Sequence, residues 1–367
     1  MPATNTQVAD STDVPFRPPA RLPLNTFGVP FGLSGLAGTW TAGIELGAPN
    51  TVGKVIWSAA AAAWALMLVR YVVAGLSPRA VAEDLRHPVL GPFAALVPAT
   101  GSLMSARLST WWPTLGNGLV WVMLALSVGF GGWFIARLLT VPRDSATLHG
   151  GHLLPTVAAS FISAQSLATI GHPGVAKALF ATGIVFWFLI GALSLGRFTT
   201  GPAIPQPLLP TLAIFSAPPA VAGNAWWAIA GGRSDTVHEF LLGAMTTMLL
   251  PQLFLIRTYL RLPFALGFWA LTFTTAASAT YGIRLLSLTT APWRTPLGWA
   301  VLGAATAVIG AVAVRSLPLL LAPRAQGHRG GDCKKNGPVS HSVCAVRRCW
   351  FEWRWKTCTN PLSQQLG

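Results

Sequence analysis

The chain of 367 residues is 52% hydrophobic and carries a net charge of +15, yet only 10% of its residues are charged. Soluble domains usually have roughly 25% charged residues, which keep their surfaces in solution. Disordered chains, by contrast, are poor in apolar residues. The composition therefore excludes an ordinary soluble enzyme and a disordered protein, and it predicts an all-α integral membrane protein.

Charged residues leave ten long uncharged stretches along the chain. A helix that crosses a bilayer needs about 20 mostly apolar residues. Each of the longest stretches contains a polar, Gly/Pro-rich loop and so holds one span. We therefore predict a ten-helix transmembrane pore domain over residues 27–321, between a cytoplasmic segment 1–26 and a basic tail 322–367. The ten stretches are 27–44, 55–69, 88–106, 108–136, 145–176, 178–196, 198–232, 240–256, 262–283 and 295–314.

Lysine and arginine are placed unevenly between the two sides of these predicted spans. With the N-terminus inside, the inner loops carry more of them than the outer loops, and the tail adds eight more. This bias predicts that both termini are cytoplasmic, in a multi-pass protein of the plasma membrane. Anchoring at the lipid surface accounts for the positive charge, so we expect no nucleic-acid partner.

The predicted spans fall into two kinds by their content of small or kinking residues. Gly, Ala, Ser, Thr and Pro make up 55 of 90 residues in the odd-numbered spans and 37 of 91 in the even-numbered ones. Small residues allow close packing or leave room for a path, whereas bulky apolar residues suit a surface that faces lipid. The alternation predicts five helical hairpins, each with one inner and one outer helix.

Proline recurs on the small-residue spans, which we interpret as helix kinks around a central pore. Proline removes a backbone hydrogen bond and frees carbonyl groups. Close packing and simple helix bending stay open as alternatives for each position. The prolines of interest and two neighbouring pore-lining candidates are Pro30, Pro98, Pro155, Pro218, Thr272 and Thr274.

Three segments carry a resemblance to a known family. The segment HPVLGPFAALVPATGSLMSARL (87–108), with its acidic lead-in Glu83 and Asp84, resembles a signature of the tellurite-resistance/dicarboxylate transporter (TDT) family, which includes TehA-like proteins and plant slow-type anion channels. The opening FGVPFGLSGLAGTW (27–40) is similar to the first helix of that family. The segment GFWALTFTTAASAT (267–280) is similar to its ninth helix.

The resemblance covers roughly residues 25–320 and has several implications. It implies a homotrimer in which each subunit has its own pore, formed by the five odd-numbered helices. It also implies a phenylalanine that plugs the pore near mid-membrane, and Phe273 stands at the matching position. Plant channels of the family commonly have proline just after this residue, whereas this chain has Thr274, which puts the local kink in doubt.

The remaining ionisable residues give little sign of a charged site. Arg107, Arg284, Glu45 and Glu239 lie near predicted span ends, where snorkelling explains them. The histidines, among them His149 with His152, fall in loops or at span ends, so we expect no metal, and we expect no cofactor. All four cysteines lie in the tail, which we interpret either as a disordered segment that touches lipid or as a wrong reading frame.

These observations favour a channel or transporter that moves small anions, inorganic or carboxylate, through a weakly polar pore gated by a mid-membrane phenylalanine. A proton-coupled C4-dicarboxylate, sulfite or tellurite carrier is the alternative. A membrane enzyme would need clustered His, Asp or Glu within the spans, and the sequence has none. The sequence does not name the physiological anion.

Overall fold

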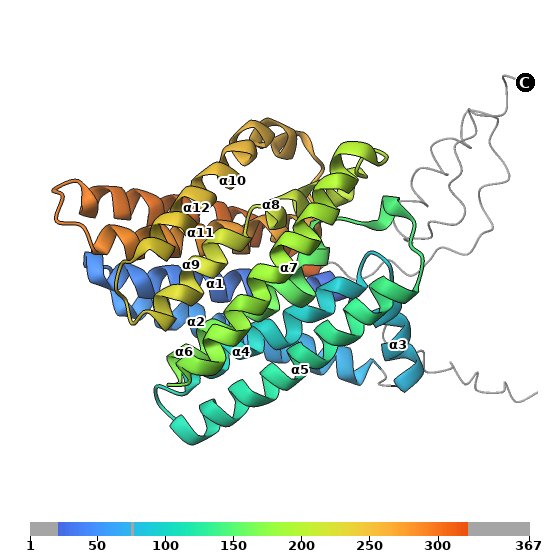
Figure 1. The fold of residues 1–367 in the computed structure, drawn as a ribbon, viewed down its shortest axis with the longest axis horizontal. Coiled ribbons are helices and arrows are strands. Elements are labelled where there is room, and N and C mark those ends of the chain that lie inside the picture. The colour runs from blue at the N-terminus through green and yellow to red at the C-terminus, as the bar shows by residue number, and fades with distance from the viewer. Residues whose placement is uncertain (1–20, 75–76, 322–367) are drawn as a thin grey trace, which may run out of the picture. The chain divides into compact units, whose positions relative to one another are not determined.

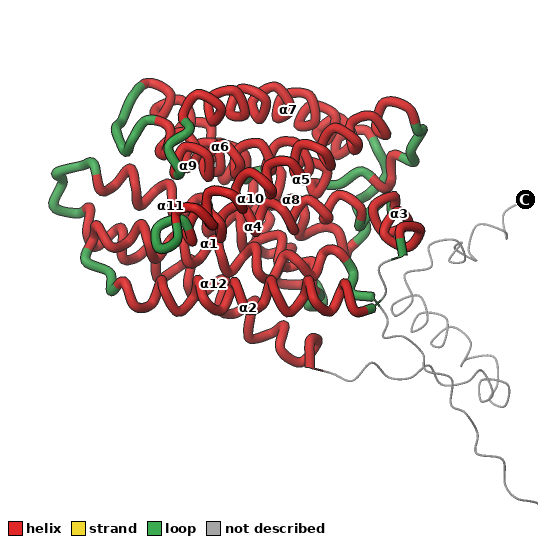
Figure 2. The backbone as a smooth tube through the Cα atoms, turned by 90° about the horizontal axis from the view of Figure 1, so that it is seen from below, coloured by secondary structure: helices red, strands yellow, loops and turns green. Residues whose placement is uncertain are grey.

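The computed structural model describes residues 21–74 and 77–321, in which helices are joined by loops and turns and no strand occurs (Figures 1 and 2). The N-terminal segment 1–20 and the tail beyond 321 lie outside the described residues, so the expectations for the tail and its cysteines are not addressed. The α-helices are α1 (Gly28–Ala42), α2 (Asn50–Val73), α3 (Pro78–Arg86), α4 (Leu96–Leu108), α5 (Pro113–Thr140), α6 (Ala159–Thr169), α7 (Pro173–Thr200), α8 (Leu212–Phe215), α9 (Pro218–Ile229), α10 (Thr236–Arg261), α11 (Trp269–Ser287) and α12 (Arg294–Leu321).

Long apolar helices account for the membrane character of the fold. In the described residues, six helical segments are long and apolar enough to cross a membrane, or seven if the bent pair 78–86 and 91–108 forms one span. Five of the six have between 11% and 28% of their apolar window buried, whereas the segment 206–229 is 83% buried. The remaining expected spans contain α1, α6 and α11, which are shorter α-helices of 15, 11 and 19 residues.

The helices form an inner and an outer layer. In the inner layer α1 contacts α4, α4 contacts α6, α6 contacts α9, α9 contacts α11, and α11 returns to α1, so that these five helices close a ring. We call them the inner ring. Each is followed along the chain by a longer helix that packs on its outer side, and these outer helices are α2, α5, α7, α10 and α12.

Each inner segment begins with a short stretch of irregular helix. 3₁₀ turns directly precede α1, α4 and α11, a π-helical turn, Leu154–Ala158, precedes α6, and α9 is preceded by a 3₁₀ turn and the short helix α8. Pro30 and Pro98 are the third residues of α1 and α4, and Pro218 is the first residue of α9. Proline fits these positions because its missing N–H has no helical partner in the first turn.

Glycine allows the inner helices to approach one another closely. A Cβ atom on Gly223 of α9 would lie 2.4–2.6 Å from three ring carbons of Tyr281 on α11. Tyr281 is fully buried, and its hydroxyl group donates to the backbone carbonyl of His238 on α10. Three helices therefore meet at a point that has no room for a side chain on α9.

The outer helices expose large apolar side chains, as helices in contact with lipid do. Phe188 on α7 is 65% exposed and Phe254 on α10 is 84% exposed.

The outer helices begin with residues that commonly start helices. Pro113 opens α5 and Pro173 opens α7, while the carboxylate of Asp235 caps α10 by accepting from the His238 N–H at 3.1 Å.

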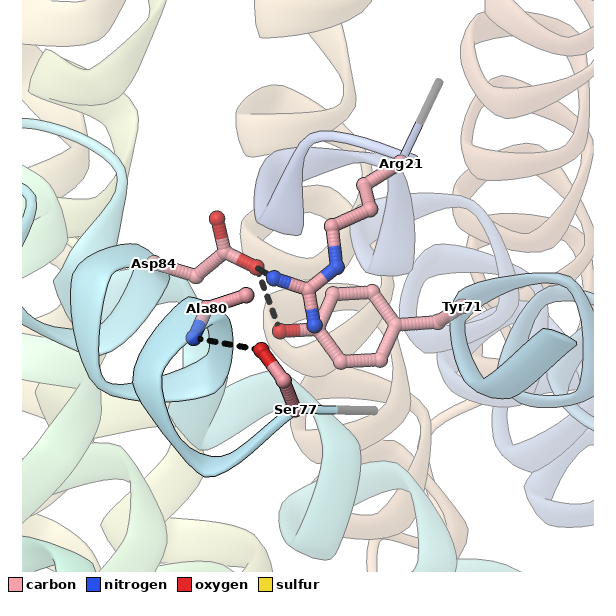
Figure 3. Close-up of polar contacts among 5 residues, drawn as sticks. All are labelled: Arg21, Tyr71, Ser77, Ala80 and Asp84. Atoms are coloured by element: carbon pink, nitrogen blue, oxygen red, sulfur yellow. Dashed lines mark hydrogen bonds and ion pairs between the residues drawn. The ribbon is translucent and has the colours of Figure 1, made fainter. Parts of the chain in front are cut away.

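A polar cluster fastens the short helix α3 to the start of the described chain (Figure 3). Asp84 of α3 accepts a hydrogen bond from the Tyr71 hydroxyl at 2.7 Å and forms an ion pair with Arg21 at 3.0 Å. The Arg21 guanidinium also lies over the Tyr71 ring, and Ser77 caps α3 by accepting from the Ala80 N–H. Asp84, part of the acidic lead-in noted in the sequence, thus joins α3 to α2 and to the segment before α1.

Candidate functional site

An apolar cavity lies inside the inner ring. The space open to the centre of a water-sized sphere is ≈ 40 Å³, and one water needs about 10–15 Å³ on this measure, so about three waters would fit. Every residue that lines it belongs to the first part of one of the five inner segments. The lining includes Asn25, Phe31, Phe93, Leu96, Leu154, Val157, Ile214, Pro218, Val221, Leu266, Phe273 and Thr274. The cavity is therefore central to the ring and open to all five helices.

Two stacked aromatic rings form one wall of this cavity. The rings of Phe31 on α1 and Phe273 on α11 are 3.6 Å apart between centroids and inclined by 14°. Behind them, a Cβ atom on Gly35 would lie 3.1 Å from the Phe273 ring. Beyond the pair, a Cβ atom on Gly38 would meet no heavy atom within 4 Å. The two rings thus stand between the cavity and an open space farther along α1.

Past the two rings, polar groups replace the apolar lining. The hydroxyl groups of Thr39 on α1 and Thr280 on α11 lie 3.0 Å apart. The side-chain amide of Asn224 on α9 donates to the carbonyl oxygens of Ala220 and Ala277 at 2.9 Å each. Each of these bonds is local to its helix or links neighbouring helices of the inner ring. Past the two rings, the contacts between inner helices are therefore polar and buried, whereas the lining of the cavity is mostly hydrocarbon.

The six positions named from the sequence for kinks or pore lining separate into two groups. Pro218 and Thr274 line the cavity, and the Thr274 hydroxyl donates to the Ala213 carbonyl at 3.0 Å. Thr272 is fully buried against α1, where a Cβ atom on Gly32 would collide with it. Pro155 faces a separate groove beside α5, and Pro30 and Pro98 are buried in first helical turns.

The helix that carries Phe273 is unbroken. α11 runs as one α-helix through Phe273 and Thr274, since Thr274 keeps its backbone N–H where proline would lose it. Phe273 is held in place by its contacts with α1. Its neighbour Phe268 lies in the preceding 3₁₀ turn and lines a different groove, between α10 and α12.

Two histidines expected in a loop are buried beside the cavity. The His149 Nε2–H lies 2.9 Å from the Val89 carbonyl, and its Nδ1 accepts from the Gly151 N–H at 3.1 Å. Its ring also stacks on Phe93, with centroids 5.6 Å apart. Both ring nitrogens are occupied in the neutral form, and burial lowers the pKa of His149 to about 4. His149 is thus a structural tie between two inner segments where they begin.

Sequence reasoning missed Phe31, Asn224 and Arg284 as residues of the ring interior. Phe31 had a usable signal, because its α1 neighbours Gly28, Gly32 and Gly35 leave it as the one large ring on that stretch. Arg284 was attributed to snorkelling at a span end. The contact that places it, with Asn224 60 residues earlier, has no local signal in the sequence.

Comparison with known proteins matches this architecture to one family. A family model described as "Voltage-dependent anion channel" (SLAC1) matches residues 21–317. The tellurite resistance protein TehA homolog of Haemophilus influenzae is 29% identical over 273 residues, which cover 71% of this chain and 80% of that protein. The resemblance inferred from the three sequence segments is confirmed.

Two plant proteins extend the comparison. The guard cell S-type anion channel SLAC1 and the S-type anion channel SLAH2, both of Arabidopsis thaliana, are each 26% identical to the chain. The matches cover 73% and 80% of this chain but only 52% and 58% of the plant proteins, so the chain spans little more than half of their length. Because the family model covers most of the chain, this is a multi-pass membrane protein of the SLAC1/TehA voltage-dependent anion channel family, whose members are channels and not enzymes.

Proposed function

We propose that the chain conducts small anions, inorganic or carboxylate, through a path inside the inner ring, and that Phe273 gates this path. The observation that carries the proposal is the apolar cavity, lined by all five inner segments and walled by the stacked rings of Phe31 and Phe273. A narrow hydrophobic constriction stops ions because water leaves it. Rotation of the Phe273 ring would widen the passage toward the open space beside Gly38.

The electrostatics of the ring favour an anion at the cavity. All five inner segments begin at the end of the bundle where the cavity lies, as its lining from each of their first parts indicates. A helix N-terminus carries about half a positive charge. Five such ends around a weakly polar cavity attract an anion without binding it tightly, which suits conduction.

The wider assembly belongs to the same proposal. Ten spans arranged as five hairpins would place both termini in the cytoplasm, and three copies would each carry their own path in the plasma membrane. Single cysteines at Asn50, Asn117 and Ser234 are expected to react with a membrane-impermeant reagent from outside, whereas those at Ser77 and Ser145 are not. Labelling on the opposite sides would overturn this orientation.

Replacement of Phe273 tests the gate. In planar bilayers with chloride on both sides, Phe273→Ala should raise the conductance by about tenfold or more, the effect of removing a barrier of at least about 1.4 kcal/mol. The order of preference among chloride, nitrate and small carboxylates should stay the same, because the ring blocks the path without coordinating the ion. The helix should remain inserted, since alanine is tolerated in a span and the Phe273 side chain makes no hydrogen bond.

Phe268→Ala is the matched control, because Phe268 is an aromatic residue of the same segment that does not line the cavity. Its conductance should stay near that of the natural chain. Equal currents from the natural chain and Phe273→Ala, at equal amounts of reconstituted protein, would contradict the gate. A reversal potential that follows the pH gradient instead of the anion gradient would identify a proton-coupled carrier in place of a channel.

A further inference from the structure

Arg284 lies on α11 beyond Phe273, where it contacts α9, a neighbouring helix of the inner ring. It lies 11 residues after Phe273 on α11, which is three helical turns, so the two side chains leave the same face of the helix about 16 Å apart. Its contacts are with α9, the next helix of the inner ring. The position therefore continues the line of the path, and it is not a lipid-facing span end.

One edge of the Arg284 guanidinium is fixed and the other edge is open. Nη1 donates to the side-chain oxygen of Asn224 at 2.9 Å and to its backbone oxygen at 3.3 Å. The group also lies 5.9 Å from the centre of the Trp227 ring. Nε and Nη2 have no hydrogen bond, and they are absent from the buried, unpartnered atoms of the described chain, so they are accessible to solvent.

No carboxylate neutralises this arginine within ion-pair distance. The ion pairs within 4.0 Å in the described part of the chain are Arg21 with Asp84 and Arg79 with Glu83. Glu45, which acts on Arg284 electrostatically, is exposed and makes no such pair with it. Asn224 is itself held by two backbone carbonyls. A neutral, rigid support thus holds a cation that has no carboxylate in direct contact with it, and the nearby Glu45 acts on it only from beyond ion-pair distance.

The positive charge of Arg284 offsets the negative helix C-termini at this end of the ring. The five inner helices are parallel, so their C-termini gather here, each with about half a negative charge that repels an anion. Arg107 is also on the last turn of an inner helix, but it lines a groove between α2, α4 and α5 and so faces away from the ring interior. Of the two arginines in the last turns of the inner helices, Arg284 is the one whose bonds are with another inner helix.

We propose that Arg284, positioned by Asn224, is an anion-binding station at this far end of the path, where a permeating inorganic anion or small carboxylate rests against Nε–H and Nη2–H. The proposal rests on the proposed function, since it assumes an anion path through the ring. It assigns to this residue the capture of anions from dilute solution, a role distinct from the gate at Phe273.

The test adds and removes charge at this site in a folded channel. In the full chain carrying Phe273→Ala, the tail cysteines Cys333, Cys344, Cys349 and Cys358 are replaced by serine and Arg284→Cys is introduced. Chloride conductance is recorded from 10 mM to 1 M before and after reagents are added to both sides. The reagents are aminoethyl methanethiosulfonate, which attaches a positive charge, and sulfonatoethyl methanethiosulfonate, which attaches a negative one.

Loss of the charge should raise the chloride concentration that gives half-maximal conductance by about fourfold or more. Fourfold corresponds to about 0.8 kcal/mol, the interaction of two unit charges about 5 Å apart in water. The positive reagent should return the value most of the way to that of the parent channel, and the negative reagent should raise it further. Arg233→Cys is the matched control, because Arg233 is an exposed arginine between α9 and α10, and both reagents should change its conductance by less than twofold.

The outcomes separate this proposal from the proposed function. If the Phe273→Ala parent conducts chloride but Arg284→Cys and both of its adducts keep the parent's concentration dependence, the station is refuted and the channel stands. If the parent carries no anion current, the proposed function itself fails. If Arg284→Cys does not insert, Arg284→Lys decides: a station keeps the parent's half-maximal concentration, whereas an arginine needed only for its bonds to Asn224 leaves lysine as impaired as Arg284→Gln.

Discussion

The inner and outer helices of this protein follow opposite rules. Inner helices are short, begin irregularly and bury small residues, whereas outer helices are long, regular and expose large apolar side chains. The inner helices must leave space at their centre and still contact one another around a closed ring, which small residues permit. The outer helices only have to fill the boundary with lipid. The two layers therefore differ in the size of the side chains that their packing allows, and not in hydrophobicity.

The largest expected effect comes from adding a single methyl group to the inner ring. Gly223→Ala would place its Cβ atom 2.4–2.6 Å from ring carbons of the buried Tyr281, and overpacking of this kind costs about 1–3 kcal/mol. We expect the melting temperature of the protein in detergent to fall by several degrees. Gly243→Ala on α10, where no heavy atom lies within 4 Å of the new Cβ, is the matched outer variant and should melt no lower than the natural chain. Equal melting temperatures for the two variants would break the distinction between the layers.

The second effect concerns the ring that supports the gate. Phe31→Ala removes the partner stacked on Phe273 and frees the Phe273 ring to turn. Without this contact the Phe273 ring is no longer held on one side, so the conductance should rise severalfold, to a value between those of the natural chain and Phe273→Ala. Single-channel recording measures this directly. Unchanged conductance in Phe31→Ala, with Phe273→Ala active, would mean that Phe273 closes the path alone.

The sequence predicted the two layers because their signal is local and repeated. The content of small residues alternates from span to span, except in the tenth span, which is as rich in small residues as the inner ones although α12 lies in the outer layer. The resemblance of segment 267–280 to the ninth helix of the family also identified Phe273 as the candidate gate. The assignment of single residues to the ring interior was harder, because it depends on which helices become neighbours. Phe31 meets Phe273 from 242 positions away, and no nearby pattern encodes that contact.

The prolines illustrate the same limit from another direction. Their presence on the small-residue spans predicted kinks within helices, but Pro30, Pro98 and Pro218 occupy the first turns of their α-helices. Short elements before them, 3₁₀ turns before α1 and α4 and the helix α8 before α9, decide where each α-helix begins, and such short elements carry weak sequence signals. Arg284 shows the opposite case. The sequence placed it correctly near a span end, but only its hydrogen bond with Asn224 shows that the side chain turns toward α9.

A third, smaller effect is a dependence of stability on pH that arises where the inner segments begin. The folded pKa of His149 is lowered to about 4 by burial, while the unfolded value is near 6.5. Because the unfolded chain binds the proton more readily, His149 contributes stability fully above pH 6.5, and this is lost as the pH falls toward 4. The free energy of unfolding should fall between pH 6.5 and 5 with a slope on the order of 1 kcal/mol per pH unit, and the melting temperature should fall with it. His149→Gln, which keeps a donor and an acceptor without titrating in this range, should reduce that slope without abolishing it, because burial also lowers the pKa of the neighbouring His152. An equally steep slope in the variant would assign the whole effect to other groups.

The smallest effect is expected on the outer layer, at Phe254 of α10. This side chain is 84% exposed, so Phe254→Leu exchanges one apolar group in lipid for another, and lipid chains are as apolar as leucine. The free energy of unfolding should change by no more than surface substitutions usually do, within about 0.5 kcal/mol, and the trimer that we propose should keep its size on native gels. Phe134→Leu, at a position that is 2% exposed beside His152, is the buried counterpart and should lower the melting temperature because the smaller side chain leaves a cavity. Dissociation of the oligomer in Phe254→Leu would show that α10 faces another subunit instead of lipid, and the outer layer would then need its own division into a lipid face and a contact face.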